Sequence, residues 1–330
     1  MSRISVLGAG AWGTALALSL ARRGGHDLVL WAHSAVLGKA LNDDGQNVPY
    51  LPGFTVPADV QITSDLLTAV EHGEILLCVT PAQHLRGMAT QIAPHLKRYQ
   101  VLVSASKGIE ERSFLRMSQV VASVTENPFA VLSGPSFALE VAQGSPTAVV
   151  VAATDAGLSQ RLQREFSSQT LRVYTNDDVT GVELGGALKN VIALAAGVTH
   201  GLGLGYNSSA ALLTRGVAEI TRLSVACGGR RQTLAGLAGL GDLVLTCTGT
   251  LSRNRAVGIE LGRGRKLPEI LKSLNGKVAE GVSSTAAALG LAARYGVEMP
   301  IAEQVDAILH RGRDPREAIR ELMSRPGRDE

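Results

Sequence analysis

Apolar residues in the first half of the chain gather in short runs, and these runs predict a buried β-sheet. Helical stretches separate several of them. This alternation favours a mainly parallel, doubly wound sheet with helices on both faces. The runs are Ile4–Gly8, His26–His33, Ile75–Thr80, Val101–Ser106, Phe129–Gly134, Thr147–Ala153 and, as a last short strand, Leu171–Asp178.

The pattern changes at about Val179. From there a long helical pattern punctuated by glycine runs to residue 203, without the alternation of a strand. Helical segments continue to the end, where Asp314 and Pro315 have the order of a helix cap and a first helical residue. We therefore expect two domains, an α/β domain over residues 1–178 and an all-α domain over residues 179–330.

The segment Ile4–Ala21 holds no charged residue and is open to three interpretations. Its length suits a short membrane helix, and its basic flanks resemble an export signal. However, Gly8, Gly10 and Gly13 stand in the order G-x-G-x-x-G between an apolar run and a helical pattern. That context favours the first turn of a dinucleotide-binding, Rossmann-like fold and disfavours an integral membrane segment.

Each glycine of this turn has a different physical task. Gly8 permits the sharp turn, Gly10 lets a pyrophosphate approach the backbone, and Gly13 lets the helix pack on the strand. The following apolar run ends at His33 without the Asp or Glu that would bind a ribose 2′-hydroxyl. The turn thus predicts NADP(H) or NAD(H) as the cofactor and does not choose between them.

Composition excludes several other classes of protein. The 330 residues are 45% hydrophobic and 18% charged, which is typical of folded cores and not of disorder. A net charge of +3 and 4% aromatic residues, without a basic run, disfavour nucleic acid as a partner. Cys78, Cys227 and Cys247 are too far apart for a metal site or a disulfide framework, so we expect no metal and a reducing, cytoplasmic compartment.

Two lysines stand where helices and strands do not need them. Lys107 follows a predicted strand directly, and the carboxyl ends of strands form the ligand crevice of an open α/β sheet. Lys189, with Asn190 beside it, lies in a helical stretch of small and apolar residues. An ammonium group among such neighbours loses hydration, which suits it to proton transfer near neutral pH. Both lysines are therefore candidate functional residues.

A third group of polar residues lies in the C-terminal half. Asp242 and Thr246 are one helical turn apart, so their side chains can point the same way. Arg253 and Asn254 follow in a loop or at a helix start, and the guanidinium fork matches phosphate oxygens. This spacing predicts a site for a small phosphorylated or otherwise acidic substrate.

These residues fall within motifs that resemble, nearly from end to end, the bacterial type of NAD(P)-dependent glycerol-3-phosphate dehydrogenase. Two departures are Ala11, where some relatives have Ser, and the loop at Tyr206–Ser209, where Tyr206, Ser208 and Ser209 differ from the residues of relatives and Asn207 does not. The motifs are GAGAWGTALA, NVPYLPG, SASKGIE, LSGPSFA, GALKNVIALAAG, ALLTRG, GLGDLVLTCT, SRNRAVG, VAEG and PREAIRELMSR.

The resemblance implies roles for individual residues. Lys189 is expected to be the general acid, or the proton acceptor in the oxidative direction, with Lys107 and Asp242 as further catalytic residues. The implied substrate site comprises Lys107, Gly134, Ser136, Lys189, Asn190, Asp242, Thr246, Ser252, Arg253 and Asn254. The implied cofactor site comprises Gly8, Gly10, Ala11, Trp12, Gly13, His33, Lys107, Ala138, Arg253, Val278 and Glu280.

The same resemblance implies a reversible hydride transfer that reduces dihydroxyacetone phosphate to sn-glycerol 3-phosphate for phospholipid synthesis. Two other functions stay open from the residues themselves. A β-hydroxyacid dehydrogenase also joins a Rossmann domain to helices, and a non-catalytic nucleotide sensor would need only the glycine turn. The sequence leaves a homodimer, feedback regulation and the choice between NADPH and NADH open.

Overall fold

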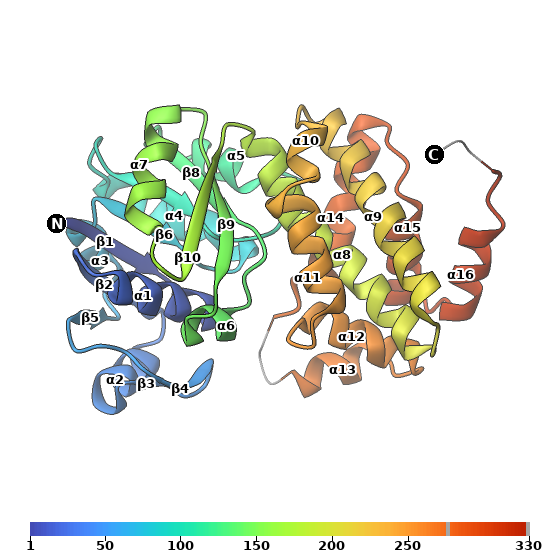
Figure 1. Ribbon diagram of the computed structural model, residues 1–330, viewed down its shortest axis with the longest axis horizontal. Helices are drawn as coiled ribbons and strands as arrows, with labels where there is room; N and C mark the ends of the chain where they lie inside the picture. The colour runs from blue at the N-terminus through green and yellow to red at the C-terminus, as the bar shows by residue number, and fades with distance from the viewer. Residues whose placement is uncertain (275–277, 328–330) are drawn as a thin grey trace. The chain divides into compact units, whose positions relative to one another are not determined.

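A computed structural model describes residues 1–274 and 278–327 (Figure 1). The chain forms two compact units. One comprises Met1–Lys107 with Leu115–Glu183, and the other comprises Gly108–Phe114 with Leu184–Glu330. The domain ranges 1–178 and 179–330 stay a prediction.

The first unit is built on one eight-stranded sheet, whose order is β10-β9-β8-β7-β6-β1-β2-β5. All neighbouring strands are parallel except β8 and β9, which confirms the predicted, mainly parallel sheet. The strands of this sheet are β1 (Ser2–Leu7), β2 (His26–Trp31), β5 (Val60–Thr63), β6 (Ile75–Cys78), β7 (Val101–Ser104), β8 (Phe129–Ser133), β9 (Thr147–Ala152) and β10 (Leu171–Asn176).

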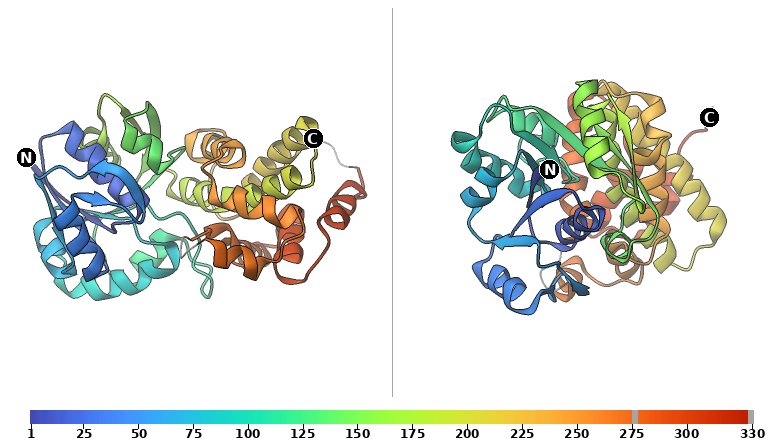
Figure 2. Two further views of the ribbon diagram at one scale, coloured as in Figure 1. Left: turned by 90° about the horizontal axis from the view of Figure 1, so that it is seen from below. Right: turned by 60° about the vertical axis from the view of Figure 1, so that its left-hand side comes forward.

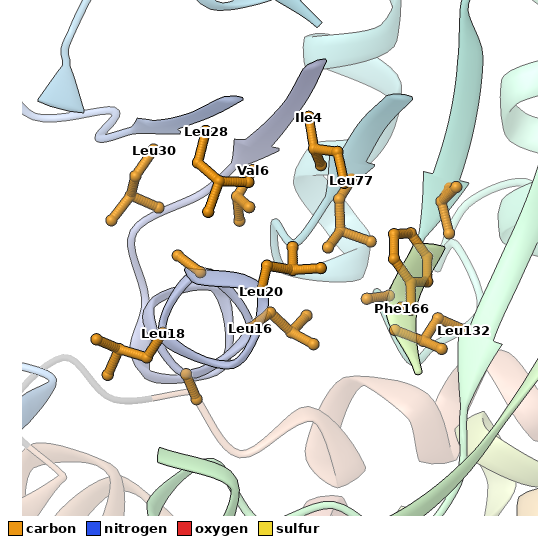
Figure 3. Close-up of a cluster of buried hydrophobic side chains, with 14 of the residues drawn as sticks. Ile4, Val6, Leu16, Leu18, Leu20, Leu28, Leu30, Leu77, Leu132 and Phe166 are labelled. Carbon is orange, nitrogen blue, oxygen red and sulfur yellow. The ribbon is translucent and has the colours of Figure 1, made fainter. Parts of the chain in front are cut away.

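Alternate residues of β1, β2, β6 and β7 point into two different apolar clusters, as expected for strands that are covered on both faces. In β1, Ile4 and Val6 belong to one cluster and Leu7 to the other. Figure 3 shows Leu16 and Leu20 of the first helix beside the first of these clusters. Helices α1 (Ala11–Arg23), α6 (Ala138–Gln143) and α7 (Ala156–Phe166) cover that face, and α3 (Leu66–His72), α4 (Leu85–Ile92) and α5 (Met117–Ala122) cover the other.

The N-terminal stretch without charge is a strand, a turn and a helix, as predicted. Helix α1 is 13 residues long, and its C-terminus is capped by Gly24 at a φ of 74°. Arg22 and Arg23 occupy its last turn, where positive charge interacts favourably with the helix dipole. The interpretation of this stretch as a nucleotide-binding turn therefore has the required secondary structure.

The segment between the second and third predicted strands holds structure that the apolar pattern does not predict. It contains α2 (Ala35–Asp44), the edge strand β5, and a separate two-stranded antiparallel sheet of β3 (Gln46–Asn47) and β4 (Leu51–Thr55). These strands are short and hold proline, glycine and polar residues, so they lack the apolar run on which the prediction relied. The predicted strand at His26–His33 also ends earlier, at Trp31.

Helices form the regular structure of the second unit over its described residues, as predicted for an α-domain (Figures 1 and 2). Tyr206–Ser209, predicted as a loop, is instead the first turn of a helix. The helices are α8 (Val179–Gly201), whose first turn belongs to the first unit, α9 (Tyr206–Ala226), α10 (Arg231–Leu234), the π-helical turn η3 (Leu237–Gly241), α11 (Asp242–Thr248), α12 (Arg253–Gly262), α13 (Leu267–Ser273), α14 (Glu280–Tyr295), α15 (Pro300–His310) and α16 (Pro315–Met323).

Helices α8 and α12 cross through glycines. A Cβ atom built on Gly197 would lie 2.2 Å from the carbonyl oxygen of Arg255, and one built on Gly258 would lie 2.1 Å from that of Leu194. Gly201 and Gly262, one turn further along, are equally close to the opposite backbone. The two backbones therefore touch without intervening side chains, as small residues at a helix interface permit.

Helix α8 is the one single helix among the described residues that is long and apolar enough to cross a membrane. Of its most apolar window, 94% is buried within the protein. This burial is typical of the central helix of a folded core.

Candidate functional site

The three glycines of the first turn differ in their surroundings as their predicted tasks require. Gly8 has a φ of 135°, and a Cβ atom there would lie 2.7 Å from the carbonyl oxygen of Val79. A Cβ atom on Gly13 would lie 1.8 Å from the carbonyl oxygen of Gly8. Around Gly10, in contrast, a Cβ atom would meet nothing within 4 Å. Gly10 therefore leaves open space beside the backbone, and the other two glycines are needed for packing.

The start of α1 is suited to an anion. No side chain caps its N-terminus, and its first turn holds no acidic residue. Ala11 and Trp12 supply backbone N–H groups of this turn, and the indole Nε1 of Trp12 is buried without a hydrogen-bond partner in the described part of the chain. Free N–H groups and the positive end of the helix dipole bind phosphates, so the turn fits the pyrophosphate of a dinucleotide.

His33 lies two residues beyond the end of β2 and is exposed. Its imidazole contacts Trp31 edge to face, with ring centroids 5.7 Å apart. Ser34 caps α2 by accepting a hydrogen bond from the N–H of Leu37. A neutral or charged imidazole at this position is compatible with either a ribose hydroxyl or a 2′-phosphate.

Lys107, Gly134 and Ser136 come together at the carboxyl ends of β7 and β8. Lys107 Nζ donates to the carbonyl oxygen of Gly134 at 2.8 Å, and Ser136 Oγ donates to the same oxygen at 2.9 Å. Gly134 has a φ of 127°, and a Cβ atom there would lie 3.1 Å from Cα of Val149. This crowded, left-handed position favours glycine. Ala138 opens α6 shortly afterwards.

The second unit buries an ion pair between α8 and α11. Lys189 Nζ donates to Asp242 Oδ1 at 2.5 Å and to Thr246 Oγ1 at 2.8 Å. Thr246 Oγ1 donates its own proton to the carbonyl oxygen of Asp242 at 2.6 Å, so it accepts from the lysine with a lone pair. Lys189 is 7% exposed, Thr246 4% and Asp242 1%.

This pair modifies the expectation from the apolar sequence around Lys189. Burial alone disfavours an ammonium group, but an adjacent carboxylate favours it. Asp242 is the first residue of α11 and follows the π-helical turn η3 directly. Gly185 packs against that turn, because a Cβ atom there would lie 2.5 Å from the carbonyl oxygen of Ala238. The glycines before Lys189 thus let the turn that precedes its counter-ion approach α8.

A chain of amide hydrogen bonds joins α8, α12 and α14. Asn254 Nδ2 donates to Asn190 Oδ1 at 2.9 Å, and the N–H of Gly281 donates to Asn254 Oδ1 at 2.9 Å. Ser252 caps α12 by accepting from the N–H of Arg255. Arg253, the first residue of α12, is exposed.

Two residues that the resemblance places in the cofactor site flank this network. Glu280 is the first residue of α14, and Val278 is 43% exposed just before it. Because Gly281 is the next residue after Glu280, the amide chain fixes the backbone at the start of α14.

Glu183 is a residue of the first unit that the sequence analysis missed. Its carboxylate is buried and accepts from the N–H of Ser118 at 2.6 Å, the Oγ of Ser118 at 2.7 Å and the guanidinium of Arg116 at 2.5 Å. Burial raises the pKa of Glu183, and these partners oppose that rise. The sequence signal that could have identified Glu183 is that it is a lone acidic residue in the apolar, glycine-rich stretch of α8.

The two buried cysteines are not suited to nucleophilic chemistry. Burial raises the pKa of the Cys78 and Cys247 thiols to about 12. A thiol needs to ionise to act as a nucleophile. Over residues 1–274 and 278–327, no three His, Cys, Asp or Glu side chains are arranged to hold a metal ion.

Comparison with known proteins gives one consistent result. The family model described as NAD-dependent glycerol-3-phosphate dehydrogenase N-terminus matches residues 3–159, and the model of the C-terminus of the same enzyme matches residues 178–320. A protein of Acidobacterium capsulatum named glycerol-3-phosphate dehydrogenase (NAD(P)+) is 60% identical over the whole of both chains.

Two further relatives agree with it. The protein of the same name from Koribacter versatilis is 57% identical over all of this chain and 99% of its own. The crystal structure of glycerol-3-phosphate dehydrogenase from Coxiella burnetii matches with a TM-score of 0.94 and 41% identity, over 98% of this chain and 99% of that one.

Proposed function

The chain belongs to the NAD-dependent glycerol-3-phosphate dehydrogenase family, and on this basis we propose which of its residues carry out the reaction. The enzyme is an oxidoreductase that uses NAD(H) or NADP(H) to reduce dihydroxyacetone phosphate to sn-glycerol 3-phosphate. The observation that carries the proposal is the buried group of Lys189, Asp242 and Thr246.

Lys189 is the proposed general acid. A reduced nicotinamide, when bound, would supply a hydride to the C2 carbon of the substrate, and negative charge would develop on the C2 oxygen. A positioned ammonium group stabilises that charge and donates a proton to the oxygen. In the oxidative direction the same amine accepts the proton from the C2 hydroxyl.

Asp242 and Thr246 hold Lys189 for this task. The carboxylate favours the ammonium form, which is the form that can donate a proton. Thr246 fixes the direction of Nζ, because its hydroxyl proton is already bonded to the carbonyl oxygen of Asp242. Lys107, which is held by the carbonyl oxygen of Gly134, is proposed to contact both substrate and cofactor.

The remaining polar residues are proposed to hold the phosphate end of the substrate and the cofactor. Arg253 offers an exposed guanidinium fork at the start of α12, and Ser252 and Asn254 flank it. Gly134 and Ser136 belong to the same proposed substrate site. The proposed cofactor site consists of Gly8, Gly10, Ala11, Trp12, Gly13, His33, Lys107, Ala138, Arg253, Val278 and Glu280.

The setting of the reaction is a further part of the proposal. Glycerol 3-phosphate is the backbone of phospholipids, so we assign the product to phospholipid synthesis. Cys78, Cys227 and Cys247, all within the described residues, form no disulfide with one another, which supports a cytoplasmic location. The modest net charge of +3 and the few aromatic residues support small molecules, not nucleic acid, as partners, and a homodimer is the proposed assembly.

The test is loss of nicotinamide absorbance with dihydroxyacetone phosphate, with NADPH and NADH in parallel. Lys189→Ala leaves a buried carboxylate without its counter-ion, so it is paired with Lys189→Met/Asp242→Asn, which removes both charges. Thr199→Ala is the matched control, because Thr199 is a buried residue of α8 whose hydroxyl bonds only within that helix in the described structure, to the carbonyl oxygen of Ala195.

We expect turnover by the wild type and by Thr199→Ala, and a loss of about 10²- to 10⁴-fold in both Lys189 variants. Full activity in a folded Lys189 variant would overturn the role of this lysine. Arg253→Ala tests the phosphate site in the same assay. Turnover of a carboxylate substrate, and not of dihydroxyacetone phosphate, would favour the β-hydroxyacid dehydrogenase alternative.

A further inference from the structure

Asn47 is buried against the glycine turn, although it lies outside the main sheet and outside the proposed site. It is the last residue of β3 and is 0% exposed. Its Nδ2 donates to the carbonyl oxygen of Ala9 at 2.8 Å and to Thr14 Oγ1 at 2.7 Å. Ala9 stands between Gly8 and Gly10, and Thr14 lies in the first turns of α1. One side chain thus holds both sides of the turn.

The bond to Ala9 sets the direction of the next N–H group. A trans peptide is planar, and its C=O and N–H point in opposite directions. The described peptide bonds include no cis bond. Because the carbonyl of Ala9 points at Asn47, the N–H of Gly10 points away from Asn47. Gly10 is also the glycine of this turn whose missing side chain leaves open space.

The orientation of the Asn47 amide follows from the same contact. With the amide reversed, Oδ1 would face the carbonyl oxygen of Ala9, and two acceptors would repel each other. In the observed orientation Oδ1 is buried without a hydrogen-bond partner in the described structure. An unsatisfied buried acceptor lowers stability. A side chain kept in this arrangement is consistent with a function beyond folding.

We propose that Asn47 is a positioning residue for the dinucleotide, which orients the Ala9–Gly10 peptide so that its N–H faces the pyrophosphate and its carbonyl oxygen faces the protein. An anion is attracted by the N–H and repelled by the carbonyl oxygen, so the orientation of this one peptide affects binding. Asn47 acts through the turn and touches neither substrate nor cofactor. The inference rests on the proposed use of the glycine turn for the cofactor.

The test is calorimetric titration of NADH and NADPH into the full chain, which does not depend on turnover. Asn47→Ala removes the bond that orients the peptide, and we expect the Kd of both dinucleotides to rise about tenfold, the loss of one good hydrogen bond. Asn47→Asp has the same shape but an acceptor-only, charged group beside the carbonyl of Ala9. It is expected to raise Kd further than Asn47→Ala.

Steady-state kinetics supply a second readout. In both variants KM for the nucleotide should rise in step with Kd, and kcat at saturating nucleotide should stay within about twofold of the wild type. The KM for dihydroxyacetone phosphate should not move. A general loosening of the fold would instead lower kcat and raise both KM values.

Gln100→Ala is the matched control. Gln100 is a buried amide of the same unit, and its Nε2 likewise donates two hydrogen bonds, here to the carbonyl oxygens of Val70 and Gly73 at 2.7 and 2.6 Å. We expect it to lower the unfolding temperature and leave Kd unchanged. An unchanged Kd in a folded Asn47→Asp variant, or an equal rise of Kd in Gln100→Ala, would overturn the role of Asn47 but leave the proposed cofactor site in place. A wild type that binds neither dinucleotide would overturn the cofactor site as well.

Discussion

Lys189 and Asp242 form an ion pair across 53 residues of sequence, with Nζ of the lysine 2.5 Å from Oδ1 of the aspartate. The side chains are 8% and 1% exposed. Two charges that are removed from water together depend on each other, because either one alone would be left uncompensated. A substitution in this pair is therefore expected to change both the stability of the second unit and the proposed proton transfer by Lys189. Each variant needs a control for stability and a control for activity.

Asp242→Asn keeps the shape of the side chain and removes its charge. We expect kcat for the reduction of dihydroxyacetone phosphate to fall about 10²-fold or more, because the ammonium form of Lys189 loses its stabilising neighbour. Asp178→Asn is the control, since Asp178 is a buried carboxylate that accepts from the N–H of Gly181 in the first turn of α8. Equal losses of kcat in the two variants would show that loss of any buried carboxylate charge lowers kcat, and that Asp242 has no specific role.

Thr246→Val and Thr246→Ser separate the hydroxyl from the shape of the side chain. Valine cannot accept the hydrogen bond from Lys189 Nζ, so we expect kcat to fall about tenfold, whereas serine should retain most of the activity. Stopped-flow measurement of hydride transfer at saturating substrate gives the rate directly. A valine variant as fast as the serine variant would exclude a role for this hydroxyl.

Glu219 predicts a pH-dependent stability. It is 1% exposed, and its two carboxylate oxygens accept from the N–H groups of Ile301 and Ala302 at the start of α15. Burial raises its pKa from 4.5 to about 7. Because the pKa is higher in the folded state than in the unfolded state, the folded state binds the proton of Glu219 more tightly. The resulting contribution to the free energy of unfolding is complete below about pH 4.5 and is lost as pH rises through about 7.

The measurement is the free energy of unfolding in urea, from about pH 5 to 8. The decline due to Glu219 should be about 3 kcal/mol in the wild type. Glu219→Gln should lack it. Glu303→Gln, at an exposed residue of the same helix start whose charge adds only the smallest contribution to the raised pKa of Glu219, should keep most of it. The assignment fails if the slope survives in Glu219→Gln.

Gly197→Ala tests the contact between the backbones of α8 and α12. A Cβ atom would lie 2.2 Å from the carbonyl oxygen of Arg255, so the helices must separate, at a cost of roughly 1–3 kcal/mol of stability. Gly87→Ala, inside α4, is the matched change, because a Cβ atom there meets nothing within 4 Å. It should stabilise the protein by about 0.5–1 kcal/mol. Thermal unfolding of the two variants should therefore shift in opposite directions.

Local sequence patterns were sufficient for most of the first unit. Most strands of the central sheet hold consecutive buried apolar residues, so their runs are visible without tertiary information. The glycine turn was identifiable because Gly8 and Gly13 pack against backbone, a constraint that fixes the residue type. The strand β5 and the pair β3 and β4 were missed because contacts with other elements, and not an apolar run, place them.

The residues of the candidate site could be identified from the sequence, but the residues with which they pair could not. Lys189 and Asp242 were both unusual in their surroundings, yet only the fold shows that they pair. Asn47 lies in a polar segment where asparagine is common in turns, so nothing local marks it as buried. Glu183 and Glu219 were hidden in the same way, because the groups that they accept from lie far away in the sequence and include backbone N–H groups of other helices.

The reversal of direction between β8 and β9 has a consequence for how this enzyme can change. In a parallel connection the chain must return to the opposite edge of the sheet before the next strand begins. Here the connection leaves β8 and enters β9 at the same edge, and it carries Gly134, Ser136 and Ala138 along that edge. The residues before Ala138 in this connection can vary without altering the register of the parallel strands. Helix α6, which follows them, packs against α1 and receives hydrogen bonds from Arg22, so a change there would also reach the helix of the nucleotide turn.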